Sequence, residues 1–200
     1  MGTVSRECPI DPPDTAISAG PKALSNLRTP TFSLASADAT AHFECRLDGA
    51  AFAACASPFT TASLSDGSHA FEARAVDPAG YVDATPAAFA WTIDATGPRL
   101  AVTVPRQRLR TVRKRGLRIV VGCSEKCTIA TNLKHGRRVV GTARGAATAA
   151  RKTTLYVKLT KRERRALTHR RRVTLKLSTN AADGLGNRAK TDVRNLKLKR

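Results

Sequence analysis

The chain has 200 residues, of which 42% are hydrophobic, so one large or two ordinary domains can each bury a core. Its formal net charge is +20, but residues 1–97 have five basic and eleven acidic side chains, a net of −6. Residues 98–200 have thirty basic and four acidic side chains, a net of +26. This uneven division excludes a single uniformly charged surface and predicts two domains.

The sequence predicts neither a membrane span nor a signal peptide. No run approaches the roughly 18 apolar residues of a transmembrane helix, and the N-terminus lacks the charged and apolar regions of a signal peptide. Because the chain opens abruptly on a cysteine and a proline-rich stretch, we expect it to be the C-terminal piece of a longer exported polypeptide. Upstream domains of that parent chain are its expected partners, and its expected location is extracellular or at the cell surface.

Strand signals recur along the first half, where short alternating or β-branched runs end at turn residues about every ten positions. This spacing is typical of a β-sandwich. Residues 1–11 are expected to be disordered or to start a linker, and an acidic domain is expected over residues 12–95. Seven strands are predicted in this domain, at residues 15–21, 29–36, 41–47, 50–55, 58–62, 68–76 and 87–94.

The second half follows a short break at residues 94–99 and is predicted to form a basic domain over residues 98–200. Only residues 160–172 have a helical pattern, in which Thr160 is the expected N-cap and Ala166 and Leu167 are expected to face inward. The predicted fold class is therefore all-β with one short helix in the second domain. Seven strands are predicted here, at residues 99–105, 116–123, 127–134, 138–144, 152–160, 171–179 and 192–199.

An internal repeat supports two copies of one sandwich plan. AVDPAGY at residues 75–81 and AADGLGN at residues 181–187 share the pattern Ala-x-Asp-x-x-Gly, and each stands between two predicted strands. An Asp that starts a turn and a Gly that can adopt a positive φ suit a tight connection between antiparallel strands.

The first half also resembles a known family. Its segments look like the immunoglobulin-like (Ig-like) or fibronectin-type-III-like repeats of large secreted and surface proteins of bacteria, and the resemblance covers most of residues 12–94. The hairpin from Cys45 to Cys55 belongs to the similar part. The segments concerned are FECRLDGAAFAAC (43–55), LSDGSHAFEARAVDPAGYVD (64–83) and AAFAWTID (87–94).

The second half resembles a companion basic Ig-like sandwich that ends some of these proteins. The similar segments are LRTVRKRGLRIVVGCSEKC at residues 109–127 and the AADGLGN turn, although nothing here is equivalent to Trp91. Together the resemblances imply two consecutive Ig-like antiparallel β-sandwiches of about seven strands each. They also imply a structural or adhesive module without catalysis.

Four of the five cysteines form two close pairs, Cys45 with Cys55 and Cys123 with Cys127, which favours an oxidising compartment. CSEKC lacks the second ligand pair of a zinc site, and apolar strands flank it in place of the helix that follows a redox pair. A disulfide across a hairpin with a Ser-Glu-Lys loop fits better, with reduced, half-buried thiols as the alternative.

The geometry of the Cys45–Cys55 bond and the partner of Cys8 are less defined by the sequence. Asp48-Gly49 favours a two-residue turn whose register does not suit a bond between Cys45 and Cys55, so that bond requires an odd-length loop or a bulge. Cys8 has no partner nearby in the sequence. It is expected to pair with an upstream cysteine or another chain, or to be a free thiol.

Catalytic groups do not converge in this sequence. The four histidines stand in unrelated contexts, and none belongs to a nucleophile, zinc or phosphate motif. Several aspartates invite a calcium hypothesis, but no DxDxDG spacing occurs and turn formation explains them better. We therefore predict no catalytic residue, no metal site, no cofactor and no small-molecule substrate.

The basic half raises a sharper hypothesis, because clustered cations attract any polyanion through a salt-dependent, sequence-independent force. An anionic cell-wall polymer or a nucleic acid would fit, although Tyr156 is the only aromatic residue in this half and base stacking is not expected. The alternative is that these side chains simply solvate the wet faces of strands. The candidate residues are Arg110, Arg113, Lys114, Arg115, Arg137, Arg138, Arg162, Arg164, Arg165, Arg170, Arg171 and Arg172.

Taken together, these patterns predict a non-catalytic structural or adhesive Ig-like segment of an extracellular or cell-surface bacterial protein. The alternative prediction is a polyanion-binding module that acts through residues 98–200.

Overall fold

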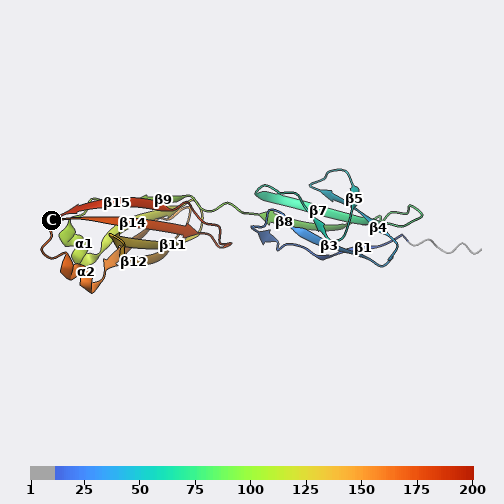
Figure 1. The fold of residues 1–200 in the computed structure, drawn as a ribbon. Coiled ribbons are helices and arrows are strands. Elements are labelled where there is room, and N and C mark those ends of the chain that lie inside the picture. Colours follow the sequence, from blue (N-terminus) through green and yellow to red (C-terminus); the bar gives the residue numbers. More distant parts are fainter. Residues whose placement is uncertain (1–11) are drawn as a thin grey trace, which may run out of the picture. The chain divides into compact units, whose positions relative to one another are not determined.

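The computed structural model describes residues 12–200, and the chain divides into two compact units between Ala95 and Thr96 (Figure 1). We call residues 12–95 unit 1 and residues 96–200 unit 2. The predicted all-β class is confirmed, since strands account for most of the regular structure in both units. The expectations for residues 1–11, including Cys8, lie outside the described residues. No helix of the described part is long and apolar enough to cross a membrane.

Unit 1 consists of two sheets. The second sheet contains one strand that the sequence did not predict, the two-residue β2, which pairs in parallel with β8. One sheet has the order β1 (Thr15–Ala19), β3 (Thr31–Ser36), β6 (Phe59–Thr60). The other has the order β2 (Leu24–Ser25), β8 (Ala87–Ile93), β7 (Gly67–Val76), β4 (His42–Leu47), β5 (Ala53–Cys55).

Aromatic side chains from both sheets fill the core of unit 1. Phe32 of β3 stacks on Phe71 of β7 with ring centroids 4.1 Å apart, and both residues are fully buried. Trp91 of β8 meets Phe32 edge to face at 5.2 Å. Because β3 and β7 belong to different sheets, these contacts hold the two sheets face to face.

Unit 2 differs from the expected pair of separate sheets, because its seven strands form one hydrogen-bonded sheet. The strands β12 and β13 pair only through Gly141 with Leu159 and Thr142 with Lys158. A Cβ atom at Gly141 would lie 2.7 Å from the carbonyl oxygen of Lys158, so only glycine allows this close approach. The strands are, in order, β15 (Asp192–Lys199), β14 (Arg172–Ala182), β11 (Cys127–His135), β12 (Arg138–Ala147), β13 (Thr153–Leu159), β10 (Leu117–Cys123) and β9 (Leu100–Thr103).

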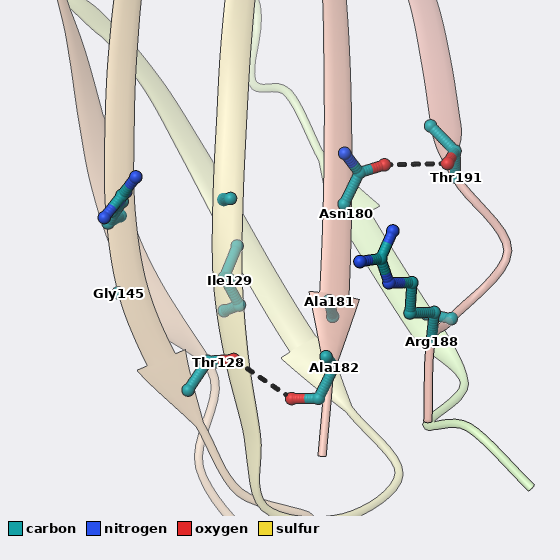
Figure 2. A pocket seen from close by; sticks show the side chains of 11 residues that line it. Thr128, Ile129, Gly145, Asn180, Ala181, Ala182, Arg188 and Thr191 are labelled. Atoms are coloured by element: carbon teal, nitrogen blue, oxygen red, sulfur yellow. Dashed lines mark hydrogen bonds between the residues drawn. The ribbon is translucent and has the colours of Figure 1, made fainter. Parts of the chain in front are cut away.

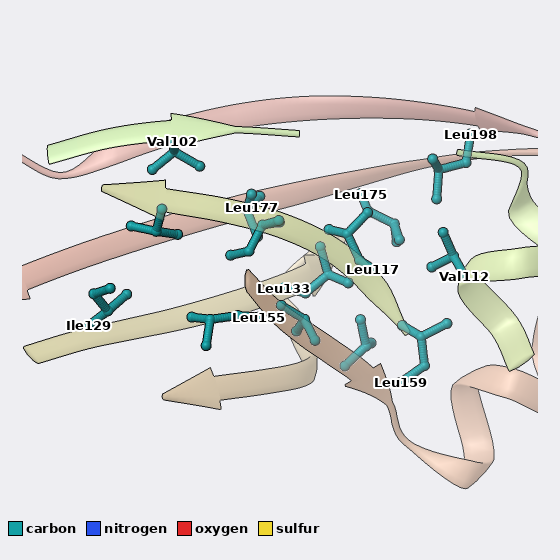
Figure 3. Packing of buried hydrophobic residues seen from close by; sticks show 14 of the residues in the cluster. Val102, Val112, Leu117, Ile129, Leu133, Leu155, Leu159, Leu175, Leu177 and Leu198 are labelled. Carbon is teal, nitrogen blue, oxygen red and sulfur yellow. The ribbon is translucent and has the colours of Figure 1, made fainter. Parts of the chain in front are cut away.

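The core of unit 2 is aliphatic (Figure 3). Leu117 of β10 and Leu155 of β13 pack with Leu133 of β11 and Leu177 of β14 in one buried cluster. Two layers of strands therefore enclose one core, although the β12–β13 pairing joins them. The layers are β9-β10-β13 and β12-β11-β14-β15. Alternating buried and exposed residues along these strands produce this arrangement.

Both units have the same order of strands, which agrees with the prediction of two copies of one plan. In each unit the first, second and fifth main strands lie together, and the fourth lies beside the third in the other layer. This order corresponds to an Ig-like arrangement in which the fourth strand has moved to the sheet of the third. The matching sets are β1-β3-β6 with β9-β10-β13, and β8-β7-β4-β5 with β15-β14-β11-β12.

The repeated Ala-x-Asp-x-x-Gly segments form the same turn. Asp77 Oδ1 accepts a hydrogen bond from the amide of Tyr81 at 2.7 Å, and Asp183 Oδ1 accepts one from the amide of Asn187 at 2.9 Å. Gly80 and Gly186 have φ values of 91° and 89°, a region that favours glycine. The shared sequence therefore encodes one connection between the last two strands of each unit.

Two helices lie in unit 2 where one was predicted. The predicted helix is α2 (Lys161–Ala166), and Thr160 caps it by accepting a hydrogen bond from the amide of Glu163 at 3.3 Å. Leu167 is buried as expected, but Ala166 is exposed, and the inward-facing side chain of α2 is Glu163. The unpredicted helix is α1 (Leu109–Arg115), which buries Leu109 and Val112 and has no side-chain N-cap.

Candidate functional site

The disulfide between Cys45 and Cys55 forms because an extra residue after the Asp48-Gly49 turn changes the strand register. Asp48 and Gly49 both have positive φ, and the amide of Ala50 donates to the carbonyl of Leu47 at 3.0 Å, which closes the expected tight turn. One extra residue follows, because Cys45 lies opposite Ala53 and not opposite residue 52. This shift places both cysteines on one face of the sheet, with Cα atoms 5.8 Å apart.

The disulfide between Cys123 and Cys127 is not the hairpin staple that the sequence predicted. Cys123 ends β10 and Cys127 begins β11, but these strands do not pair with each other. They belong to the two layers of unit 2, so the bond fastens one layer to the other at the connection between them. Both cysteines are at least nine-tenths buried.

The predicted polyanion-binding residues fall into three places. Arg137 and Arg138 lie at the turn between β11 and β12, apart from the rest. Arg115, Arg162, Arg171 and Arg172 are exposed along the helices and the start of β14. The remaining six line two adjoining hollows at the α1 and α2 end of unit 2, where Figure 1 also shows the C-terminus. These six are Arg110, Arg113, Lys114, Arg164, Arg165 and Arg170.

The larger of these hollows, which we call the basic cleft, lies between α1 and α2 and has a volume of about 590 Å³. Five of its six lining residues are cationic. They come from two connections about fifty residues apart, so the tertiary structure gathers them. The lining residues are Arg113, Lys114, Lys161, Arg164, Arg165 and Thr168.

One guanidinium in the cleft is held in place. Arg113 Nε donates to the carbonyl of Arg164 at 3.2 Å, and its Nη2 donates to Oγ1 of Thr168 at 2.9 Å. Thr168 in turn donates to the carbonyl of Arg164 at 3.2 Å. The sequence did not indicate Thr168, because a single threonine becomes a partner of Arg113 only after the two helices meet.

A buried carboxylate anchors α2 beside the cleft. Glu163 is only 3% exposed and accepts a hydrogen bond from His135 Nδ1 at 2.6 Å, and Arg138 Nη2 lies 4.0 Å from its other oxygen. Both of these partners come from the β11–β12 hairpin. The charge of Glu163 is therefore directed away from the cleft cations and toward the hairpin.

The described arginines of unit 1 form ion pairs with carboxylates, in contrast to the cations of the cleft. Arg74 pairs with Glu44 and Arg46 with Glu72, both at 2.6 Å and both directly across the β4–β7 ladder. The ring of Phe52 lies under both guanidinium groups, 4.1 and 4.5 Å from them. Within the described part of the chain, no carboxylate forms an ion pair with Arg113, Lys114, Lys161, Arg164 or Arg165.

A second hollow of about 620 Å³ lies at the other end of unit 2, across β11, β12 and β14 (Figure 2). Small residues such as Gly145 and Ala182 line it, and Thr191, which also lines it, donates a hydrogen bond to Asn180 at 2.7 Å. Arg188 lies at its margin and points toward Asn180. The sequence did not predict this hollow.

His69 has the closest histidine–carboxylate contact of unit 1. Its Nδ1 donates to Asp48 Oδ2 at 2.7 Å, and its Nε2 donates to the carbonyl of Ser65 at 3.0 Å. These two hydrogen bonds, first the one to Asp48, raise the pKa of His69 above its ordinary value. No hydroxyl or thiol nucleophile is bonded to His69 within the described residues, so this pair ties the β4–β5 turn to β7.

Comparisons with known proteins assign no family. No family model and no curated protein matches the chain. Among solved structures, it is similar to a tetra-tandem repeat in the extending region of a large adhesion protein, with 16% identity, a TM-score of 0.41, and coverage of 94% of this chain and 49% of that one. The chain thus spans about half the length of that structure.

Two further structures show a similar level of likeness. A Ca²⁺-stabilized adhesin of an Antarctic bacterium has 12% identity and a TM-score of 0.47, with coverage of 94% and 48%. The fibronectin(III)-like modules of Clostridium thermocellum CbhA have 15% identity and a TM-score of 0.37, with coverage of 93% and 94%. At TM-scores below 0.5, these likenesses assign no function to this chain.

Proposed function

We propose that this chain is a non-catalytic structural segment, of the spacer or adhesive type, in an extracellular or cell-surface protein. In this proposal each unit is a self-contained Ig-like module that transmits tension between the parts of the protein on either side. The observation that supports it best is where the chain enters and leaves each unit.

The chain enters and leaves unit 1 at opposite ends. Thr15, at the start of β1, accepts a hydrogen bond from the amide of Ala75 at 2.7 Å, near the end of β7. Ile93, at the end of β8, lies opposite Gly67, the first residue of β7. The length of β7 therefore separates the two points, about 26 Å at 3.3 Å per residue.

Unit 2 has the same arrangement. The chain enters β9 at Leu100, opposite Cys123, whose disulfide partner Cys127 begins β11 beside the end of β14. It leaves at Lys199 of β15, opposite Arg172 at the start of β14. A module that is entered at one end and left at the other can be linked in series, and a pulling force then acts along its strands.

Each unit also contains features that would stabilise it against such a force independently of the other unit. Each encloses its own hydrophobic cluster and contains one disulfide. Disulfides persist in oxidising compartments, which supports the proposed location outside the cytosol.

Single-molecule force spectroscopy on the oxidised chain, pulled from residues 12 and 200, tests the proposal. We expect two separate unfolding events, one for each unit. Reduction should lengthen the unit 1 event by about 30 Å, because a separation of 10 residues at about 3.5 Å each replaces the 5.8 Å between the Cα atoms of the bonded Cys45 and Cys55. A chain that extends without discrete unfolding events would contradict a spacer that transmits tension.

A further inference from the structure

We propose that the basic cleft is a binding site for a linear polymer of phosphate-linked polyols or sugars, held through successive phosphate groups. This assignment goes beyond the proposed spacer function, and only the choice of an extracellular polymer over an intracellular one rests on it.

The first argument is that interaction with the helix dipoles does not explain all five cations of the cleft. Cations in the last turn of a helix interact favourably with its dipole, which accounts for Arg113 and Lys114 in α1 and for Arg164 and Arg165 in α2. Lys161 is in the first turn of α2, where a positive charge is unfavourable. Holding five cations around one hollow lowers stability through repulsion, and a bound anion would remove that cost.

The second argument is the geometry of the donors. Cations face the cleft from both walls, with Arg113 and Lys114 on α1 and Lys161, Arg164 and Arg165 on α2. A phosphate has several acceptor oxygens that point in different directions, so it can accept from both walls at once. A planar carboxylate is satisfied by a single guanidinium fork.

The third argument is preorganisation. Arg113 donates hydrogen bonds to the opposite wall, from Nε to the carbonyl of Arg164 and from Nη2 to Oγ1 of Thr168. Its Nη1 group has no acceptor among the described residues and remains for a ligand. Because the guanidinium is already fixed, binding an anion costs less side-chain entropy than recruiting a free arginine.

The fourth argument favours a polymer over a single ion. A smaller hollow adjoins the basic cleft and shares Arg113 and Thr168 with it. Arg110, Arg170 and the C-terminal Arg200 line this second hollow. The cations therefore continue from α2 across Arg113 to Arg200, so that successive phosphate groups of one polymer could meet different cations.

Other polyanions fit less well. Stacking of nucleic-acid bases needs exposed aromatic rings, but Tyr156, the aromatic residue of this half, lies on β13 and does not line either hollow. Insertion into a membrane needs exposed apolar side chains, and the large exposed ones of the described residues all lie outside α1 and α2. The two disulfides favour an oxidising compartment, where polyol phosphates of the cell surface would be met before cytosolic nucleic acid.

The test is titration calorimetry of the oxidised chain with poly(glycerol phosphate), at about 50 and 200 mM salt. The cleft variant combines Lys161→Gln and Arg164→Gln, both exposed in the free protein. The matched control combines Arg188→Gln and Lys190→Gln, also exposed, in the connection after β14 at the end remote from Arg172. We expect the cleft variant to bind about ten-fold more weakly and the control to change affinity by less than about two-fold.

Each other outcome overturns the proposal. Equal losses in both variants would mean general attraction to a +26 unit, and no binding would remove the site. Tighter binding to an oligothymidylate of equal phosphate number, or binding only to vesicles of phosphatidylcholine and phosphatidylglycerol, would assign the surface to another partner. Binding of inorganic phosphate as tight as that of the polymer would exclude a polymer track.

Amide chemical shifts of the unmodified chain provide a measurement that does not depend on folding of the variants. Addition of the polymer should shift the amide resonances of residues 113–116 and 161–168 and leave those of residues 183–190 unchanged. Shifts spread evenly over unit 2 would contradict a defined cleft. Neither measurement depends on the mechanical behaviour of the chain, so failure here leaves the spacer proposal untouched.

Discussion

Unit 1 and unit 2 have the same order of strands, yet they differ in what fills their cores and in what neutralises their surfaces. Stacked rings such as Phe32 and Phe71 fill unit 1, whereas leucines and valines fill unit 2. Two cross-strand ion pairs lie on the β4–β7 ladder of unit 1, whereas the cleft cations of unit 2 have no carboxylate partner among the described residues. The strand order therefore depends on the alternation of apolar residues and on the turns, and tolerates very different side chains.

The largest expected difference comes from truncating the aromatic core. Phe71→Ala should destabilise unit 1 by about 3–5 kcal/mol, because Phe71 is fully buried between the rings of Phe32 and Phe59. Calorimetry should show the unit 1 transition moving to lower temperature while that of unit 2 stays in place. Phe52→Ala is the matched control, since this ring lies under two arginines and should cost about 1 kcal/mol. A shift of both transitions would contradict independent cores.

Removal of each disulfide should destabilise its own unit by less than truncation of the aromatic core does. By loop entropy alone, Cys45→Ser with Cys55→Ser should cost unit 1 about 2.7 kcal/mol, and Cys123→Ser with Cys127→Ser should cost unit 2 about 2 kcal/mol. Denaturant unfolding of each double variant measures these values. A loss in unit 2 well above that in unit 1 would indicate that fastening its two layers matters more than the length of the closed loop.

Salt should act on the two units in opposite directions. Added sodium chloride screens the repulsion among the cations of unit 2 and should raise its unfolding midpoint by a few degrees, equivalent to about 1 kcal/mol for a domain of this size. The same salt weakens the Arg46–Glu72 and Arg74–Glu44 pairs of unit 1 and should leave its midpoint unchanged or slightly lower. Parallel shifts of both midpoints would contradict the electrostatic contrast.

The smallest expected effect is a pH dependence of unit 1. The pKa of His69 is raised in the folded chain, chiefly by its hydrogen bond to Asp48, so folding favours the protonated imidazole. The stabilisation is fully present below the ordinary pKa of about 6.5 and is lost as the pH rises through the raised value. The thermal midpoint of unit 1 should therefore decrease as the pH rises above about 6.5. His69→Gln should abolish this dependence, and an unchanged profile in that variant would contradict it.

Much of the fold could be predicted from local sequence. The alternating runs and the turn at Asp77 and Asp183 mark the main strands and the repeated connection, because period and turn chemistry act over a few residues. Two short elements were missed. The strand β2 spans two residues, and α1 follows Arg108, which provides no side-chain cap to signal the start of a helix.

The candidate site was predictable only in part. Its arginines stood out by composition, but nothing in the sequence indicated that Arg113 and Arg164 face each other, or that Thr168 connects them. The inward position expected for Ala166 belongs instead to Glu163, because His135 of a distant hairpin satisfies its carboxylate. A helical pattern read from apolar residues alone does not detect a buried charge whose partner is elsewhere in the chain.

The sequence by itself determined the all-β class, the boundary near residue 95, the charge contrast and the paired cysteines, since each follows from local pattern or composition. Only the tertiary structure decided that the two layers of unit 2 join at Gly141, that the Cys123–Cys127 bond crosses between layers, and that cations from two distant connections share one cleft. The physical reason is that these features depend on which strands and helices become neighbours. Burial of the whole core selects those neighbours, and no short stretch of residues encodes that choice.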